Sequence, residues 1–288
     1  MGIVYLNGKL QPLAEARVSP MDRGFLFGDG AYEVIPVYGG RPFRLGEHLA
    51  RLAQTLSGIG LANPHTDAEW AAIVDQLIAT EAAADQAIYL QITRGEAPLR
   101  EQAFPTPPLA PTVFGYASAL KTPGPDQRAQ GVAAYSMQDI RWLRCDLKTL
   151  NLLANCLLRQ AAVARGGAEA ILLRDGWLTE GAASNIFIVR GGLLLAPPKS
   201  QLMLPGITYD LVLELARAHG LPHEVRPIAA AELKSADEIW ITSSAREVLA
   251  VTRLDDQPVG DGRPGPVCAQ MYAWYQAYKD SLRSGDRT

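Results

Sequence analysis

The run WLRCDLKTLNLL, residues 142–153, places Lys148 among leucines, and Lys148 is one of only six lysines in the chain. An amine must lose its proton before it can attack a carbonyl, and the ordinary pKa of a lysine is about 10.4. Apolar surroundings disfavour the charged form and lower that pKa. Lys148 is therefore a candidate Schiff-base nucleophile, although a lysine whose ammonium group reaches water is the commoner case.

Upstream of this run, residues 1–118 predict a smaller domain that mixes strands and helices. Two hairpins are expected because Asn7-Gly8 and Gly39-Gly40 separate β-prone runs and tolerate the positive φ angles of tight turns. Leucines recur at helical spacing from Leu45 to Leu56, which predicts an amphipathic helix. The pattern further predicts a helix within 67–83, strands at 86–93 and 112–117, and a long proline-rich loop at 95–111.

Residues 119–130 contain Lys-Thr-Pro-Gly-Pro-Asp and are expected to link two domains. The larger second domain, residues 131–288, is again mixed α/β and is expected to carry Lys148. Two such domains would leave a cleft between them, which is a favoured place for a ligand. The second domain predicts a helix at 150–165, paired strands at 169–196, a helix at 208–219, a strand at 238–242 and a closing helix after Pro266.

Composition argues against several classes of protein. The chain of 288 residues is 48% hydrophobic and 20% charged, with a formal net charge of −3, as in ordinary globular proteins. The sequence has no basic stripe of the kind that binds nucleic acid. No apolar run approaches the roughly 20 residues of a membrane span. The three cysteines lack metal-ligand spacing, so no metal is expected. Because the start has no secretory pattern, we expect a cytoplasmic protein with reduced thiols.

Glu180, in the run DGWLTEGAASNIF at 175–187, could act on a heteroaromatic ligand. A carboxylate about 3 Å from a protonated ring nitrogen, at an effective dielectric constant near 20, attracts it by roughly 5 kcal/mol. That attraction would keep the nitrogen protonated at neutral pH, as an electron-withdrawing pyridoxal ring requires. Taken alone, a solvated glutamate in a turn is the commoner case.

Several other segments could bind a phosphate. Residues 204–210 open a predicted helix, whose free N–H groups and dipole attract anions, and Thr208 adds a hydroxyl. Ser243 and Ser244 follow a predicted strand and offer further donors. Arg51 lies off the leucine face of its helix and could form paired hydrogen bonds with a phosphate. Taken alone, the helix start is more often an ordinary capped helix and Arg51 more often a solvated arginine, and the two serines are equally compatible with a polar loop.

Together these segments resemble the fold-type IV aminotransferases, most closely the bacterial D-amino-acid transaminases. The order and the spacing of the matching pieces both fit that family, so the joint signal is far more specific than any single piece. The pieces are DRGFLFGDGAYEV (22–34), EHLARL (47–52), DIRWLRCDLK (139–148), EAIL (169–172), TEG (179–181), SN (184–185) and GIT (206–208). The resemblance implies a two-domain pyridoxal 5'-phosphate enzyme that is a homodimer, with each active site borrowing a loop from the neighbouring subunit.

The resemblance also implies roles for individual residues. Lys148 would carry the cofactor as a Schiff base and shuttle the proton, and Glu180 would pair with the pyridine nitrogen. Tyr32 and Val34 would line the substrate pocket, where the Tyr32 hydroxyl helps to bind the substrate carboxylate. The remaining cofactor contacts would be a ring contact from Leu204 and phosphate contacts from Arg51, the Ile207 N–H, Thr208, Ser243 and Ser244.

The borrowed loop departs from the family pattern, which has an arginine, one residue and a histidine ahead of Phe-Pro. Alignment on Phe104-Pro105 needs one extra residue here, and it places Arg100 at the arginine position and Gln102 at the histidine position. Arg100 can still clamp a carboxylate, whereas Gln102 can donate a hydrogen bond but carries no charge. Ala182-Ala183 also replaces serines that are common in the family.

The implied reaction is a ping-pong amino transfer from a D-amino acid, such as D-alanine or D-glutamate, to 2-oxoglutarate or pyruvate. Three alternatives share the fold and the cofactor: a branched-chain L-amino-acid aminotransferase, an (R)-amine aminotransferase and an aminodeoxychorismate lyase. The run Trp142–Lys148 and the Arg100 loop favour the D-specific branch over the first of these. A catalytically silent binding or scaffold protein of this fold is the alternative outside the enzymes.

Overall fold

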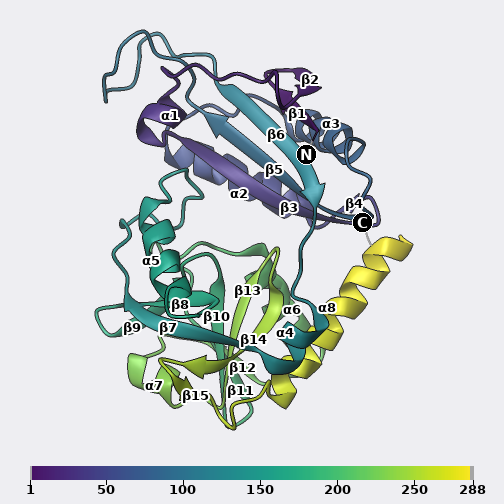
Figure 1. The fold of residues 1–288 in the computed structure, drawn as a ribbon, viewed down its shortest axis with the longest axis vertical. Helices are drawn as coiled ribbons and strands as arrows, with labels where there is room; N and C mark the ends of the chain where they lie inside the picture. The colour runs from purple at the N-terminus through teal and green to yellow at the C-terminus, as the bar shows by residue number, and fades with distance from the viewer. Residues whose placement is uncertain (1, 286–288) are drawn as a thin grey trace. The chain divides into compact units, whose positions relative to one another are not determined.

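The computed structural model describes residues 2–285, which divide into two compact units (Figure 1). Unit 1 contains residues 2–120, 147–152 and 282–285, and unit 2 contains the rest of the described chain. Two details differ from the sequence-based expectation. The segment that carries Lys148 clusters with unit 1 rather than with the C-terminal part, and the expected linker contains helix α4 (Pro125–Gln130).

A six-stranded antiparallel sheet forms the framework of unit 1, in the order β2-β1-β6-β5-β3-β4. Both predicted hairpins are confirmed, because the turns at Asn7-Gly8 and Gly39-Gly40 have positive φ angles throughout. The strands are β1 (Ile3–Leu6), β2 (Lys9–Pro12), β3 (Gly30–Tyr38), β4 (Arg41–Pro42), β5 (Asp85–Thr93) and β6 (Thr112–Ala119).

Helices α2 (Leu45–Gly58) and α3 (Asp67–Ile78) pack on one face of this sheet and bury a shared core. The predicted leucine helix is therefore confirmed, and α3 begins at the predicted residue because Thr66 and Glu69 form a capping box. Alternation along β3 sends Ala31, Glu33 and Ile35 into the buried side, and leaves Tyr32 and Val34 on the other face. The short helix α1 (Arg23–Phe27) precedes β3.

Unit 2 is built on a nine-stranded mixed sheet, whose main path is β12-β11-β10-β13-β14-β7-β8-β9, with β15 paired to β14. Its strands are β7 (Val132–Gln138), β8 (Glu169–Arg174), β9 (Trp177–Gly181), β10 (Asn185–Arg190), β11 (Leu193–Ala196), β12 (His223–Val225), β13 (Glu238–Ser243), β14 (Glu247–Leu254) and β15 (Gln257–Pro258). Its helices are α4, α5 (Leu153–Val163), α6 (Ile207–Ala218), α7 (Ala230–Lys234) and most of α8 (Pro266–Ser284).

Strands β10 and β13 are buried on both faces along most of their length, and both are apolar in the middle, at residues 186–189 and 239–241. On one face the Phe187 ring packs against Trp240 and against Tyr209 of α6. On the other face Ile188 and Ile239 join a second aliphatic core. This packing fixes α6 against the sheet, so the first turn of α6 has a defined position. Within residues 2–285, no helix is both long and apolar enough to cross a membrane.

Candidate active site

The segment around Lys148 is fixed against β3 and α2 by backbone hydrogen bonds. The Tyr32 N–H donates to the Lys148 carbonyl (3.0 Å), and the Lys148 N–H donates to Thr55 Oγ1 (3.1 Å). Lys148 Nζ lies 4.3 Å from the centroid of the Tyr32 ring. In the described part of the chain this half-buried amine forms no ion pair with a carboxylate. The backbone of Lys148 is therefore held in place, and its amine lies against the Tyr32 ring without a salt bridge to any described residue.

A buried charged cluster lies on the helix-covered face of the same sheet. Glu33 Oε1 accepts from Arg51 Nε and Glu33 Oε2 accepts from Arg51 Nη2, both at 2.8 Å, and His48 Nδ1 lies 2.8 Å from Glu33 Oε2. Burial alone would raise the pKa of Glu33, but Arg51 and His48 hold it well below its ordinary range. Burial lowers the pKa of His48, so its imidazole is neutral. Arg51 thus has a fixed orientation, and its contact with a phosphate stays a prediction.

The open face of the unit 1 sheet carries an aromatic row that sequence reasoning missed. The rings of Tyr32 and Tyr89 stack at 5.8 Å, and those of Tyr89 and Tyr116 stack at 5.2 Å. Val34 lies on this face as well. Burial raises the pKa of Tyr89 above its ordinary value, so its hydroxyl stays protonated and donates to Gln91 Oε1 (2.8 Å). The alternation in QAIYLQIT was the signal available in the sequence.

In unit 2, Glu180 is a buried carboxylate, and one of its oxygens accepts more hydrogen bonds than the other. Its Oε1 accepts from the Leu204 N–H (3.1 Å) and from Arg141 Nη1. From the described residues, its Oε2 accepts one hydrogen bond, from Asn185 Nδ2 at 3.3 Å. Burial raises the pKa of Glu180 to about 7, against the opposing pull of Arg141. Oε2 therefore has capacity to accept a further hydrogen bond from a ring N–H.

Arg141 links Glu180 to a second buried acid, and sequence reasoning assigned it no role. Its Nε and Nη2 each donate to Asp139 at 2.9 Å, and Arg174 also pairs with Asp139 (3.1 Å). One guanidinium therefore orients Glu180 while remaining neutralised by Asp139. The signal was present in DIRWLRCDLK, where Asp139 and Arg141 precede Lys148.

The first turn of α6 contains a buried hydroxyl that has no hydrogen-bond partner among the described residues. Gly206 is the N-cap and supplies no side-chain hydrogen bond, and Ile207 and Thr208 begin the helix. Thr208 is 3% exposed, and its Oγ1 has no hydrogen-bond partner among the described residues. A buried hydroxyl without a partner is costly, whereas a helix start with free N–H groups favours an anion. These features fit a bound phosphate.

Asn185 connects this helix start with Glu180 and with the end of β13. Its Nδ2 donates to the Leu204 carbonyl (2.9 Å), and in the sheet it pairs with Thr242, the residue before Ser243. A Cβ on Gly206 would lie 2.0 Å from Asn185 Oδ1, so this position requires glycine. Within unit 2, Asn185 thus links two of the predicted residues, Glu180 and Leu204, to the N-cap of α6, and its strand partner Thr242 directly precedes Ser243 and Ser244.

Comparison with known proteins gives a consistent family. Residues 30–254 match the family described as amino-transferase class IV. The chain belongs to this family. It is 41% identical over 264 residues to a D-alanine aminotransferase of Bacillus licheniformis, covering 92% of each chain. It is 37% identical over 281 residues to a D-alanine aminotransferase of Staphylococcus haemolyticus, covering 98% of this chain and 99% of that one.

Solved structures of other aminotransferases share the fold of this chain. A branched-chain amino acid aminotransferase of Escherichia coli superposes with a TM-score of 0.88 at 26% identity, covering 94% of this chain and 92% of that one. A branched-chain amino acid aminotransferase from T.th., solved with pyridoxamine 5'-phosphate, has a TM-score of 0.89 at 27% identity, covering 99% and 95%. The two-domain α/β fold of this family, expected from the sequence, is thereby confirmed.

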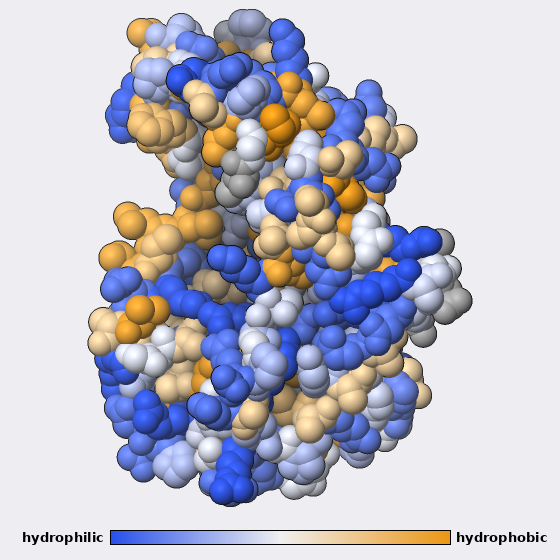
Figure 2. Space-filling model, turned by 45° about the vertical axis from the view of Figure 1, so that its right-hand side comes forward, coloured by the Kyte–Doolittle hydropathy of each residue, from blue (hydrophilic) through white to orange (hydrophobic). Residues whose placement is uncertain are grey.

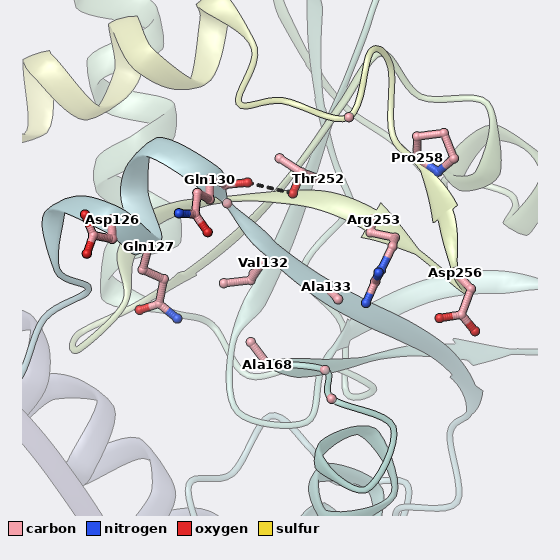
Figure 3. Close-up of a pocket in the computed structure, with 14 residues that line it drawn as sticks. Asp126, Gln127, Gln130, Val132, Ala133, Ala168, Thr252, Arg253, Asp256 and Pro258 are labelled. Carbon is pink, nitrogen blue, oxygen red and sulfur yellow. Dashed lines mark hydrogen bonds between the residues drawn. The ribbon is translucent and has the colours of Figure 1, made fainter.

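This aminotransferase also has a surface hollow of about 790 Å³ in unit 2, away from the predicted residues (Figure 3). It is lined by α4, the start of β7 and the end of β14, including Asp126, Arg253 and Asp256. None of the residues predicted to bind cofactor or substrate lines it. The hollow is therefore not the candidate active site.

Proposed function

We propose that this class IV aminotransferase moves an amino group between a D-amino acid and a 2-oxo acid, using pyridoxal 5'-phosphate held by Lys148. D-Alanine and D-glutamate are the proposed donors, and 2-oxoglutarate and pyruvate the acceptors. The observation that carries the proposal is the Lys148 amine, fixed over Tyr32 and free of any carboxylate partner within residues 2–285. Near full-length similarity to relatives named D-alanine aminotransferase supports the choice of substrate.

The residues present fit the cofactor. The unpartnered Thr208 hydroxyl and the N–H groups of the first turn of α6 would hold the phosphate, with Arg51, Ser243 and Ser244 as further ligands. Glu180 Oε2 would accept from the ring N–H, and the Leu204 side chain would pack on the ring. When bound, pyridoxal phosphate supplies an aldehyde for the amine and a ring that withdraws electrons from the substrate.

The chain's own residues then manage protons and position. The Lys148 amine would take the proton from the substrate α-carbon and return a proton on the same face, because the backbone from which its side chain extends is anchored to β3. Glu180, oriented by Arg141, would keep the ring nitrogen protonated. Tyr32 would present its hydroxyl to the substrate carboxylate, and Arg100 and Gln102 would complete the carboxylate site.

We also propose that the enzyme is a homodimer whose site is completed by the loop of the neighbouring subunit. Unit 2 exposes large hydrophobic side chains at Ile140, Leu143, Leu153 and Leu157, each more than half exposed. Several hydrophobic patches lie among hydrophilic residues on the face drawn in Figure 2. Exposed apolar area of this kind marks interaction surfaces.

We further propose that the enzyme is located in the cytoplasm. Its three cysteines are free, which fits a reducing compartment.

The proposal is tested by half-reactions of the cofactor-loaded enzyme. D-Alanine is expected to bleach the absorbance of the bound cofactor and release pyruvate, and Lys148→Ala is expected to abolish that exchange. An (R)-amine used in preference to D-alanine, or elimination of pyruvate from aminodeoxychorismate, would favour the corresponding alternative. A protein that takes up no cofactor would support the scaffold alternative.

The second candidate, a branched-chain L-amino-acid aminotransferase, is favoured by the structural neighbours, which carry that name. L-Leucine added in place of D-alanine distinguishes the two. Bleaching by L-leucine alone would select the branched-chain activity.

A further inference from the structure

The backbone of the loop at 101–103 is held by one buried arginine. Arg23, which is 2% exposed, donates from Nη1 to the Glu101 carbonyl (2.5 Å) and the Ala103 carbonyl (3.4 Å), and from Nη2 to the Gln102 carbonyl (3.0 Å). Three successive carbonyls of a surface loop therefore converge on a single guanidinium. Such carbonyls ordinarily bond to water, so this arrangement fixes the path of the loop.

Arg23 is itself oriented by a second charged pair. Its Nε donates to Asp29 Oδ2 (2.8 Å), and Arg94 binds both oxygens of the same carboxylate, at 2.8 and 3.0 Å. Arg94 also stacks on the Phe104 ring, with its guanidinium carbon 3.7 Å from the centroid. Phe104 directly follows the three carbonyls, so two arginines joined through Asp29 hold both the backbone and the next side chain.

Arg23 holds the backbone at one of the two proposed substrate contacts, Gln102, and directly after the other, Arg100. Arg100 directly precedes the clamped carbonyls, and its guanidinium carbon lies 5.0 Å from the centroid of the Phe27 ring. The Gln102 carbonyl is one of the three that Arg23 binds. The backbone of Gln102 is therefore fixed, while its side chain is exposed. The cationic Arg23 also lies over Phe27, at 4.9 Å from the centroid. Arg100 and Arg23 therefore contact the same aromatic ring, directly beside the backbone that Arg23 holds.

We propose that Arg23 is a positioning residue for substrate specificity, which sets the affinity for the substrate carboxylate by holding the loop that presents Arg100 and Gln102. This inference rests on the proposed function and on the proposed role of that loop. Arg23 would touch neither substrate nor cofactor. Its loss would let the loop move and would weaken recognition of the carboxylate more than the chemistry at the α-carbon.

The test compares Arg23→Gln and Arg23→Lys in the cofactor-loaded enzyme with two donors, D-alanine and D-alaninol, which lacks the carboxylate. Single-turnover bleaching gives the dissociation constant and the maximal rate for each donor. Arg23→Gln is expected to raise the D-alanine dissociation constant about tenfold more than that for D-alaninol. The freed loop would no longer hold Arg100 against the D-alanine carboxylate, and the loss of one hydrogen bond between charged groups corresponds to about this factor. Arg23→Lys, which keeps the charge but can reach fewer carbonyls, is expected to fall between wild type and Arg23→Gln.

Two further variants sharpen this test. Arg17→Gln is the matched control, because Arg17 is an exposed arginine of the same unit that also donates to backbone carbonyls, and it should change neither constant. Arg100→Ala should reproduce the selective loss for D-alanine. Since both residues act through one loop, the double variant should lose far less than the product of the two single effects.

The outcomes separate this inference from the proposed function. If Arg100→Ala selectively weakens D-alanine but neither Arg23 variant does, or if the effects multiply, Arg23 is not a positioning residue and the function stands. If no donor bleaches the wild-type cofactor, the proposed function itself fails. Should Arg23→Gln not fold, Arg23→Lys decides alone: equal changes for the two donors overturn the inference, and a selective change supports it. Folding of Arg23→Gln is expected, because Asp29 keeps its two bonds to Arg94.

Discussion

At the scale of single residues, Glu180 has a pKa that links cofactor binding to pH. Its folded-state pKa is raised to about 7 from 4.5, because burial disfavours the carboxylate more than Arg141 favours it. The folded chain therefore keeps a proton that the unfolded chain releases between these two values. The stability contributed by this group is complete below pH 4.5 and is lost as the pH rises through 7.

Glu180→Gln should remove that pH dependence from the cofactor-free protein. Between pH 5 and pH 8 the free energy of unfolding of the variant should rise, relative to wild type, by about 3 kcal/mol. Urea denaturation at several pH values measures the difference. Glu232→Gln is the control, since Arg226 holds the pKa of Glu232 down to about 2 and its difference should be flat over this range. A flat difference for Glu180→Gln would contradict the raised pKa.

The buried triad of Glu33, His48 and Arg51 supports a second prediction at this scale. Glu33→Gln leaves the Arg51 guanidinium buried against an uncharged amide, so unfolding should become easier by about 3–5 kcal/mol. Glu47→Gln, on the helix that carries His48 and Arg51, breaks an exposed ion pair with Arg44 and should cost less than about 1 kcal/mol. Thermal or urea unfolding compares the two, and equal losses would show that the triad contributes no special stability.

At the scale of elements, the start of α6 holds a hydroxyl that the protein alone does not use. Thr208→Val keeps the shape and removes Oγ1, which has no partner among the described residues. Stability without cofactor should be unchanged or higher, whereas affinity for pyridoxal phosphate should fall about tenfold, the loss of one hydrogen bond to a charged group. Fluorescence titration with the cofactor measures that affinity.

Thr66→Val is the control for Thr208→Val, and it should lower stability without changing cofactor affinity. Thr66 caps α3 and its Oγ1 accepts from the Glu69 N–H (3.3 Å), so its loss should cost about 1 kcal/mol of stability. Cofactor affinity should not change. If both threonine variants lose stability alike and neither loses affinity, the start of α6 is an ordinary helix cap.

Elements that depend on local chemistry were predictable, and those set by tertiary contacts were not. The turns at Asn7-Gly8 and Gly39-Gly40 and the capped start of α3 follow from neighbouring residues. By contrast, Lys148 clusters with unit 1 because of hydrogen bonds to Tyr32 and Thr55, which lie some 90 or more positions away in the chain and leave no periodic signal. Arg141 and Glu33 escaped notice for the same reason, since only the fold reveals which charges share a buried space.

At the scale of the whole molecule, the exposed apolar side chains suggest how two chains associate. Leu153 and Leu157 lie one helical turn apart on α5 and are 74% and 56% exposed. Helix α5 packs against the sheet through Leu158 and Ala162, so its outer leucines contribute nothing to the core of unit 2. Such a two-leucine face is costly to leave in water, which favours burial against a second copy.

Leu157→Glu should therefore shift the enzyme from dimer to monomer, because a carboxylate would have to be buried in an apolar contact at a cost of several kcal/mol. Sedimentation velocity at micromolar protein concentration measures the shift. Val225→Glu is the matched control, since Val225 is 48% exposed on β12 and should leave the dimer intact. Transamination should fall together with the dimer fraction if each site needs the loop of the neighbouring subunit. A Leu157→Glu variant that stays dimeric would remove α5 from the interface, and a monomer with full activity would show that one chain holds a complete site.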